Sequence, residues 1–210
     1  WAKIGGGFFL TFAEVRFDLG EPESYCLPPK IVTGHSGQRL AEDMPESVLA
    51  LFKTPKAQGY VLDGLADRIS CRMLFDAMAE NRHFQTVREG TVQAFCTGAF
   101  EPLFAQEPGF AQVRLLEAEQ SNSSVILNDR AFLKLYRKLE AGINPDFAIN
   151  LHLTEHTDFT ALAPVAGGIL LNVEGKTSSL VMLQPYFDND GDGWAFAIES
   201  AHAFVETARH

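Results

Sequence analysis

The sequence predicts an α+β fold in which a strand pair and a long helix precede a second, regular series of strands and helices. Three observations support this prediction. Apolar residues recur at helical spacing over 62–81, short apolar segments alternate with turn residues from Val113 onward, and Pro102, Pro108 and Gly109 interrupt the chain between them. We therefore expect an N-terminal subdomain over 1–108, a second subdomain over 109–187, and a linker with a final helix over 188–210.

Composition limits the classes of function. The 210 residues are 46% hydrophobic and 21% charged, which is typical of a globular protein. The net charge of −10 offers no basic face to phosphates, so a nucleic-acid partner is not expected. No run of 18 apolar residues predicts a membrane span, and no signal peptide is evident. Cys26, Cys71 and Cys96 form no CxxC pair, so we expect free thiols in a cytoplasmic protein.

The first part of the chain predicts a hairpin, a helix and a strand. Alternating residues from Thr11 to Phe17, followed by turn residues in "DLGEPE", indicate two strands around a turn. The stretch 30–47 predicts a loop, followed by a short helix near 45–52. The clearest helix covers 62–81: Asp63 can cap it, and Leu65, Ile69, Met73 and Ala77 form an apolar stripe. A short strand is expected within 88–98.

The second part predicts five strands around a helix. Strands are expected over 113–118, 124–127 and 131–137, with Asn128 and Asp129 forming a tight turn. Asn144 followed by Pro145 predicts a helix start. A hairpin follows, turning at 174–176. The final helix is expected to bury one face, made of Ala195, Ile198, His202, Phe204 and Val205.

The acidic segment between the last strand and the final helix matches a calcium-binding loop on paper. Asp188, Asp190 and Asp192 occupy positions 1, 3 and 5 of the EF-hand pattern, with Gly193 at 6 and Glu199 at 12. An EF-hand needs a helix on both sides, whereas the preceding segment "SSLVMLQPYF" is typical of a strand. We therefore favour a helix-capping hinge and keep calcium binding as the alternative.

A second metal pattern is weaker. His152 and His156 lie four residues apart, and "HLTEH" fits the inverted zinc-protease pattern with Glu155 as the base. Because no third ligand is evident downstream, an ordinary amphipathic helix is the preferred interpretation.

The order of elements from Val113 onward is that of the N-lobe of a protein-kinase-like fold. In such lobes a hairpin tip covers the nucleotide phosphates, a lysine on the third strand contacts them, and the linker meets the adenine. Here the tip is "EQSNSS" and the lysine is Lys134, which we expect inside a five-stranded sheet. The tip lacks a glycine-rich motif, and Lys134 could equally extend its stem over the surface.

The segment "EQSNSSVILNDRAFLKLYRKLEAGINPDF" resembles the maltokinase family, whose enzymes phosphorylate maltose at O1 with ATP and are often fused behind a trehalose synthase domain. The matching motifs are the "EQSN(S/T)S" tip, the "LKL(F/Y)R" strand and the "LE-G-NPD" turn. "LQPYFDNDGDGW" resembles the family's linker and "EVRFDLGEPESYCLP" its N-terminal cap. The resemblance is strong over 113–155 and moderate over most of the remaining chain.

The resemblance implies a protein-kinase-like, aminoglycoside-phosphotransferase-like N-lobe behind a cap subdomain. Lys134 would contact the ATP phosphates, and the backbone around Gln184 and Tyr186 would meet adenine. The residues that would cover the phosphates are Gln120, Ser121, Asn122, Ser123 and Ser124. Mg and ATP would serve the full-length enzyme, and maltose would bind mainly through a C-lobe.

Two departures from the family pattern affect these expectations. No catalytic-loop triplet such as "HGD" follows position 187, so we expect the C-lobe to be absent and the chain to be inactive alone. The family typically reads "NPDLE" where this chain has "NPDFA", so Ala148 stands where the acidic partner of Lys134 is expected. Glu155 is a possible substitute, but it should lie roughly 10 Å farther along the helix.

The sequence leaves three functions open. The first is the N-terminal portion of a maltokinase, and the second is a non-catalytic module that binds a partner such as trehalose synthase. The third is a calcium-binding module. We also expect homo-oligomers, because an apolar surface is predicted around the linker and final helix, made of Phe187, Trp194, Phe196 and Phe204.

Overall fold

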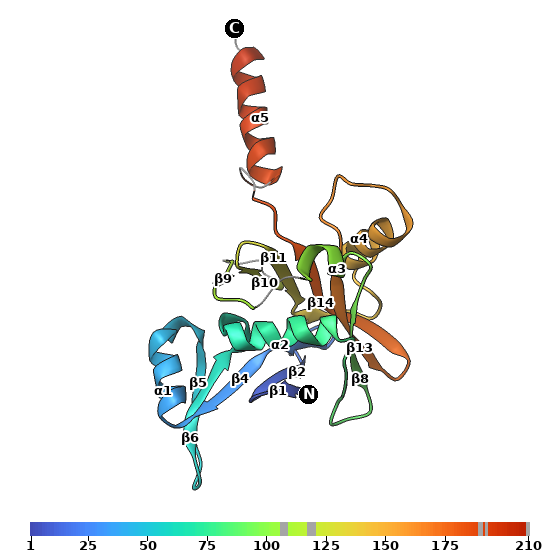
Figure 1. Ribbon diagram of the computed structural model, residues 1–210. Coiled ribbons are helices and arrows are strands. Elements are labelled where there is room, and N and C mark those ends of the chain that lie inside the picture. The colour runs from blue at the N-terminus through green and yellow to red at the C-terminus, as the bar shows by residue number, and fades with distance from the viewer. Residues whose placement is uncertain (106–108, 117–120, 189–190, 192, 209–210) are drawn as a thin grey trace.

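The computed structural model describes residues 1–210 except 106–108, 117–120, 189–190, 192 and 209–210 (Figure 1). Within the described residues the fold is mixed α/β, with two antiparallel sheets of seven strands each. Helices α1, α2 and α4 pack on these sheets, and the aromatic rings of α3 contact Phe75 of α2.

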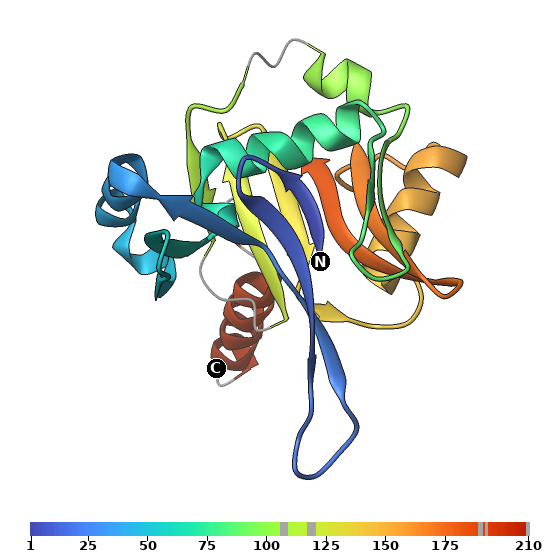
Figure 2. The same cartoon turned by 90° about the horizontal axis from the view of Figure 1, so that it is seen from below.

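The first sheet has the order β12-β3-β2-β4-β6-β5, with β1 paired to β2. Its hairpin β2–β3 projects well beyond the body of the molecule (Figure 2), and it confirms the strand pair predicted around "DLGEPE". The strands are β1 (Ala2–Gly5), β2 (Phe8–Val15), β3 (Glu23–Leu27), β4 (Pro29–Thr33), β5 (Val48–Lys53), β6 (Gln58–Asp63) and β12 (Lys138–Leu139).

The second sheet has the order β7-β8-β13-β14-β11-β10-β9. The predicted turn between its strands β10 and β11 is confirmed, because Asn128 and Asp129 have φ of 51° and 49°. The strands are β7 (His83–Gln85), β8 (Thr91–Cys96), β9 (Val113–Leu115), β10 (Asn122–Leu127), β11 (Ala131–Tyr136), β13 (Gly167–Val173) and β14 (Lys176–Pro185).

Two helices cover opposite faces of the second sheet. On one face, α2 packs its buried residues against alternate side chains such as Leu133 and Leu135. On the other face, Phe147 of α4 packs against Tyr136 and Met182. The helices are α1 (Gly34–Asp43), α2 (Arg68–Ala79), α3 (Phe100–Phe104), α4 (Pro145–His156) and α5 (Gly193–Ala208), with short 3-10 turns at Pro45–Ser47 and Gly64–Ala66. None of these described helices is long and apolar enough to cross a membrane.

Three local predictions in the first part were wrong. The segment expected as a loop contains α1, and the helix expected near 45–52 is mostly strand β5, because pairing with β6 satisfies its backbone. Asp63 caps the 3-10 turn through Leu65 N, whereas Asp67 caps α2 through Ile69 N and Ser70 N.

Strand pairing crosses the predicted boundary at 108/109. Strands β7 and β8 join the second sheet, which therefore has seven strands rather than five, and β12 joins the first sheet through β3. The division into 1–108, 109–187 and 188–210 stays a prediction. Each of the two sheets contains strands from both 1–108 and 109–187.

The final helix does not bury the face that the sequence predicts. Helix α5 extends away from both sheets (Figure 1), and the five residues expected to be buried are all exposed: Ala195, Ile198, His202, Phe204 and Val205. An apolar pattern shows that a face can be buried, but burial also needs a packing partner.

Candidate functional site

Lys134 lies on β11, an interior strand of the second sheet. Its cross-strand neighbours are Ser124 on β10 and Met182 on β14, so these three side chains share one face of the sheet. This is the face that α4 partly covers, opposite the face packed against α2. The Lys134 side chain is only 18% exposed, so most of it is shielded from water.

Among the described residues, Asp146 at the start of α4 is an acidic partner of Lys134. The Lys134 Nζ atom lies 3.2 Å from Asp146 Oδ2, to which the Tyr136 hydroxyl also donates a hydrogen bond at 3.0 Å. The other oxygen, Oδ1, accepts a hydrogen bond from Asn150 Nδ2 at 3.0 Å. These contacts fix the carboxylate, and its place in the first helical turn is favourable for a negative charge.

The local sequence explains why Asp146 occupies this position. Asn144 caps α4 by accepting a hydrogen bond from Asp146 N, and Pro145 occupies the first helical turn, which confirms the predicted helix start. Phe147 is fully buried beneath the helix and anchors it to the sheet.

The expectation that Ala148 leaves Lys134 without its ion pair was therefore wrong, because Asp146, two residues earlier, supplies the carboxylate. The substitute considered, Glu155, lies nine residues beyond Asp146, or roughly 14 Å along the helix axis. Asp146 was missed because an acidic residue beside a helix cap has an ordinary explanation in capping. Asp146 reaches Lys134 only because α4 packs against the sheet in this position.

The Lys134–Asp146 pair opens onto a small pocket of about 160 Å³. Two lysines, two carboxylates and neutral hydrogen-bonding groups surround this phosphate-sized space, which is lined by Ser121, Asn122, Lys134, Tyr136, Lys138, Glu140, Asn144 and Asp146. The buried Ser124 hydroxyl lies on the same face, and its oxygen has no hydrogen-bond partner among the described residues. The pocket thus offers lysine ammonium, hydroxyl and amide groups to an anionic ligand, while Glu140 and Asp146 balance the charges of the two lysines.

A second ion pair connects this pocket to the first sheet. Lys138 Nζ lies 2.6 Å from Glu23 Oε1 on β3, and the Tyr25 hydroxyl donates to the other oxygen of Glu23 at 2.5 Å. The hydrogen bond from Lys138 lowers the pKa of Glu23, and the same contact raises the pKa of Lys138.

The remaining predicted residues that the structure describes do not line this pocket. Ser123 pairs with Leu135 and therefore faces the α2 side of the sheet, away from Lys134. Gln120 lies outside the described residues. Gln184 is buried on the Lys134 face, where its Nε2 donates to Ala163 O at 2.6 Å. Tyr186 follows β14, and its N–H donates to Arg130 O at 2.7 Å.

The acidic loop has only part of the EF-hand arrangement. It is entered from strand β14 rather than from a helix, and α5 follows at Gly193. Asp190 and Asp192 lie outside the described residues. On α4, the His152 and His156 rings stack with their centroids 4.8 Å apart. Among the described residues, no group of three or more His, Cys, Asp or Glu could hold a metal ion.

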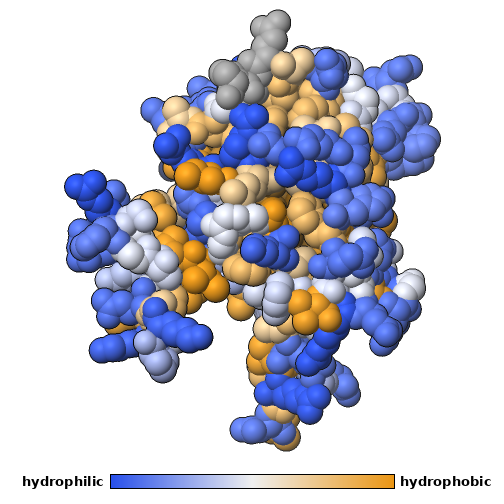
Figure 3. Space-filling model, turned by 60° about the horizontal axis from the view of Figure 1, so that its bottom comes forward, coloured by the Kyte–Doolittle hydropathy of each residue, from blue (hydrophilic) through white to orange (hydrophobic). Residues whose placement is uncertain are grey.

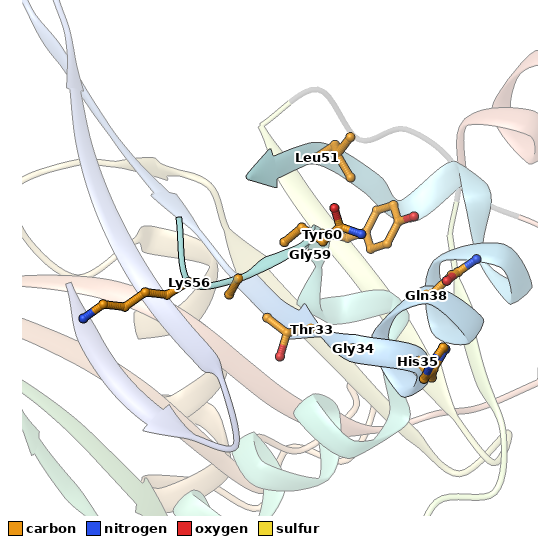
Figure 4. A pocket seen from close by; sticks show the side chains of 10 residues that line it. Thr33, Gly34, His35, Gln38, Leu51, Lys56, Gly59 and Tyr60 are labelled. Carbon is orange, nitrogen blue, oxygen red and sulfur yellow. The ribbon is translucent and has the colours of Figure 1, made fainter. Parts of the chain in front are cut away.

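Two larger hollows contain none of the predicted site residues. One of about 440 Å³ lies between α1 and the β5–β6 hairpin; its His35, Gln38 and Lys56 are exposed, and Lys56 points away from the others (Figure 4). Another of about 840 Å³ is lined by both sheets and includes Phe12, Leu139 and Leu171. The exterior view in Figure 3 shows separate hydrophobic patches among hydrophilic side chains.

Comparisons with known proteins identify a fold relative. A scan against protein-family models finds no match. A solved structure of glucosamine kinase in complex with glucosamine, ADP and inorganic phosphate is similar over 94% of this chain, with a TM-score of 0.53 and 18% sequence identity. A second glucosamine kinase structure, in crystal form A, covers 93% of the chain at 15% identity, with a TM-score of 0.49.

The first similarity shows a shared fold. The chain spans 37% of the length of that glucosamine kinase, so the match concerns little more than a third of a sugar kinase. The arrangement of two antiparallel sheets with their helices is thus one that a sugar kinase uses.

Proposed function

We propose that this chain is the nucleotide-binding N-terminal portion of a sugar kinase, with Lys134 contacting the phosphates of ATP. The observation that carries the proposal is the Lys134–Asp146 pair, which faces a pocket also lined by Ser121 and Asn122. A lysine held by a carboxylate beneath a hairpin is the arrangement that kinase-like folds use to orient nucleotide phosphates.

The nucleotide would extend from this pocket along the face of β11 and β14. Its phosphates would lie against Lys134, Ser121, Asn122 and the buried Ser124 hydroxyl. Gln184 on β14 is on the same face of the sheet, because it pairs with Phe132, two residues before Lys134 on β11. Adenine would therefore lie near Gln184 and Tyr186. The glucosamine kinase with the similar fold contains ADP, which supports a nucleotide ligand.

The described residues do not fit a magnesium site of their own. Asp146 is bound to Lys134, and no cluster of three potential metal ligands occurs in the described part of the chain. Magnesium enters this proposal only as the counter-ion of ATP, and no step depends on it.

We further propose maltose as the sugar, with maltose 1-phosphate and ADP as products of the full-length protein. The motifs "EQSNSS", "LKLYR" and "NPD" support this choice, since they resemble the maltokinase family. ³¹P NMR of the full-length protein with ATP should show maltose 1-phosphate formed from maltose in preference to phosphorylation of glucosamine. Preference for glucosamine would overturn the choice of sugar.

A non-catalytic docking module is the second candidate, favoured by the exposed apolar residues of α5. Trp194, Phe196 and Phe204 are between 73% and 76% exposed, a surface that could meet a partner domain such as trehalose synthase. This candidate predicts binding of that domain with no response to nucleotide.

An ATP titration of the 210-residue chain, followed by backbone amide NMR shifts, tests the main proposal. Lys134→Met should weaken ATP binding about tenfold or more, because it removes a charge-assisted contact to the phosphates. Lys176→Met, at the exposed β13–β14 turn, is the matched control and should bind as the unchanged chain does. Equal ATP affinity in the unchanged chain and Lys134→Met would overturn the proposal.

A further inference from the structure

Lys138 is the second lysine of the pocket, and the first sheet holds it in place. The strand that carries Lys134 ends at Tyr136, and the chain then continues into β12, which pairs with β3. Lys138 lies opposite Tyr25 in this pairing, and its ammonium contacts Glu23 two residues away. One continuous segment therefore supplies a lysine to the pocket from each sheet.

Because Lys134 and Lys138 line one pocket, both can reach a single ligand with several phosphates. Four residues of extended chain span about 13 Å between their Cα atoms, and both side chains line the same pocket. Lysine side chains are long and flexible, so the two ammonium groups can approach neighbouring phosphates of one chain from different positions.

The Glu23–Tyr25–Lys138 network fixes the second lysine. Glu23 accepts from Lys138 at 2.6 Å and from the Tyr25 hydroxyl at 2.5 Å, so both of its oxygens are engaged. Backbone pairing supports the contact, because Cys26 N donates to Arg137 O at 2.7 Å beside it. The Lys138 side chain is thereby ordered before a ligand binds, so binding loses less conformational entropy.

We propose that Lys138 is a second phosphate-contacting residue and that Glu23 and Tyr25 on β3 are its positioning residues. This inference rests on the proposed nucleotide function and adds to it a role for the first sheet. The β2–β3 hairpin, which projects from the molecule (Figure 2), would then act on the phosphate pocket through the contact of Glu23 with Lys138.

The test compares ATP with adenosine, which lacks phosphates, in NMR titrations of the 210-residue chain. Lys138→Met and Glu23→Gln should each weaken ATP binding roughly three- to tenfold, because the lost contact is charge-assisted but partly exposed. Adenosine binding should not change in either variant. A general disturbance of the fold would instead weaken the binding of both ligands. Lys138→Arg should restore part of the ATP affinity.

Double variants and matched controls separate positioning from other effects. Glu23→Gln should add no further loss in a Lys138→Met background, since its effect passes through Lys138. Glu14→Gln, an exposed glutamate on the neighbouring strand β2, and Lys176→Met should leave ATP binding unchanged.

Three results would overturn the inference, and the first two leave the proposed function standing. If Lys134→Met weakens ATP binding but Lys138→Met does not, Lys138 has no phosphate contact and the proposed function stands. If Glu23→Gln tightens ATP binding, Glu23 competes with phosphate rather than positioning Lys138. If neither lysine variant alters ATP binding, the proposed function and this inference both fail.

Discussion

At the residue scale, the ion pair between Lys30 and Asp67 is the most buried charged contact described. Lys30 Nζ lies 3.3 Å from Asp67 Oδ2, and the two side chains are 8% and 4% exposed. Asp67 also caps α2 and accepts a hydrogen bond from the Ser70 hydroxyl at 2.8 Å. The pair therefore connects β4 of the first sheet to the helix that covers the second.

Removing one partner should be strongly destabilising. Lys30→Met leaves the Asp67 carboxylate buried without its cation, so the free energy of unfolding should fall by about 3–5 kcal/mol in urea denaturation. The control is Arg82→Met, which breaks an exposed pair with Glu80 and should cost at most about 1 kcal/mol. Equal losses in the two variants would contradict this account.

Buried thiols give a second prediction at this scale. Burial raises the pKa of Cys26 to about 12 and also raises that of Cys71, so both stay protonated at pH 8. A thiol reagent at that pH should modify the half-buried Cys96 first and reach Cys26 and Cys71 only on unfolding. Mass spectrometry of the native chain checks this; rapid labelling of Cys26 would count against its burial.

The contacts around Lys134 show what could be anticipated from the sequence and what could not. Lys134 stands out because a lysine inside an apolar strand needs a reason, and Asn144 with Pro145 marks a helix start. Asp146 could not be assigned in this way, since its contact with Lys134 depends on how α4 rests on the sheet. The same is true of Glu23, which is 115 residues from Lys138 in sequence.

At the element scale, the position of α4 depends on a close approach at Gly168. A Cβ atom at Gly168 would lie 2.3 Å from the Phe147 ring, which is fully buried between the helix and the sheet. The glycine therefore allows α4 to approach closely enough for Asp146 to contact Lys134.

Gly168→Ala should displace the helix or its Phe147 anchor. We expect the free energy of unfolding to fall by about 1–3 kcal/mol, as for other overpacked cores. Gly98→Ala is the matched control, because a Cβ there meets nothing within 4 Å, and its stability should be unchanged or slightly raised. Urea denaturation of both variants gives the comparison; a neutral Gly168→Ala would contradict the close packing of α4.

Elements with strong local signals were predictable. Helices α2 and α4 and the β10–β11 turn follow from apolar spacing, capping residues and turn residues. The segment 34–53 was misassigned because Gly34, Ser36 and Gly37 suggest a loop although they begin α1, and Pro45 suggests a helix although β5 follows. Pairing with β6, a long-range contact, decides the second case.

At the scale of the whole molecule, α5 is the element without a covering surface in the described chain. Its large apolar side chains Trp194, Phe196 and Phe204 are exposed, and Phe187 before it is 58% exposed. Several large exposed apolar side chains on one element favour association.

We therefore predict that the 210-residue chain self-associates as its concentration rises. Replacing Trp194, Phe196 and Phe204 with serine should return it towards a monomer in sedimentation experiments. Leu19→Ser, which changes an exposed residue on the β2–β3 turn away from α5, should have no such effect. A monomeric unchanged chain at high concentration would contradict the prediction.

The overall organisation was only partly predictable. The strand order after Val113 predicted a five-stranded sheet, but it gave no sign that β7 and β8 extend that sheet or that β12 joins the other. Such pairings link segments far apart in sequence, and short strands such as Lys138–Leu139 carry too little pattern to reveal them.

The most direct test of the central claim is a crystal structure of the chain with a non-hydrolysable ATP analogue. The account predicts phosphate oxygens within hydrogen-bond distance of Lys134 Nζ, beside Ser121 and Asn122, with adenine near Gln184 and Tyr186. An analogue bound elsewhere, or bound with Lys134 turned away from its phosphates, would contradict the account.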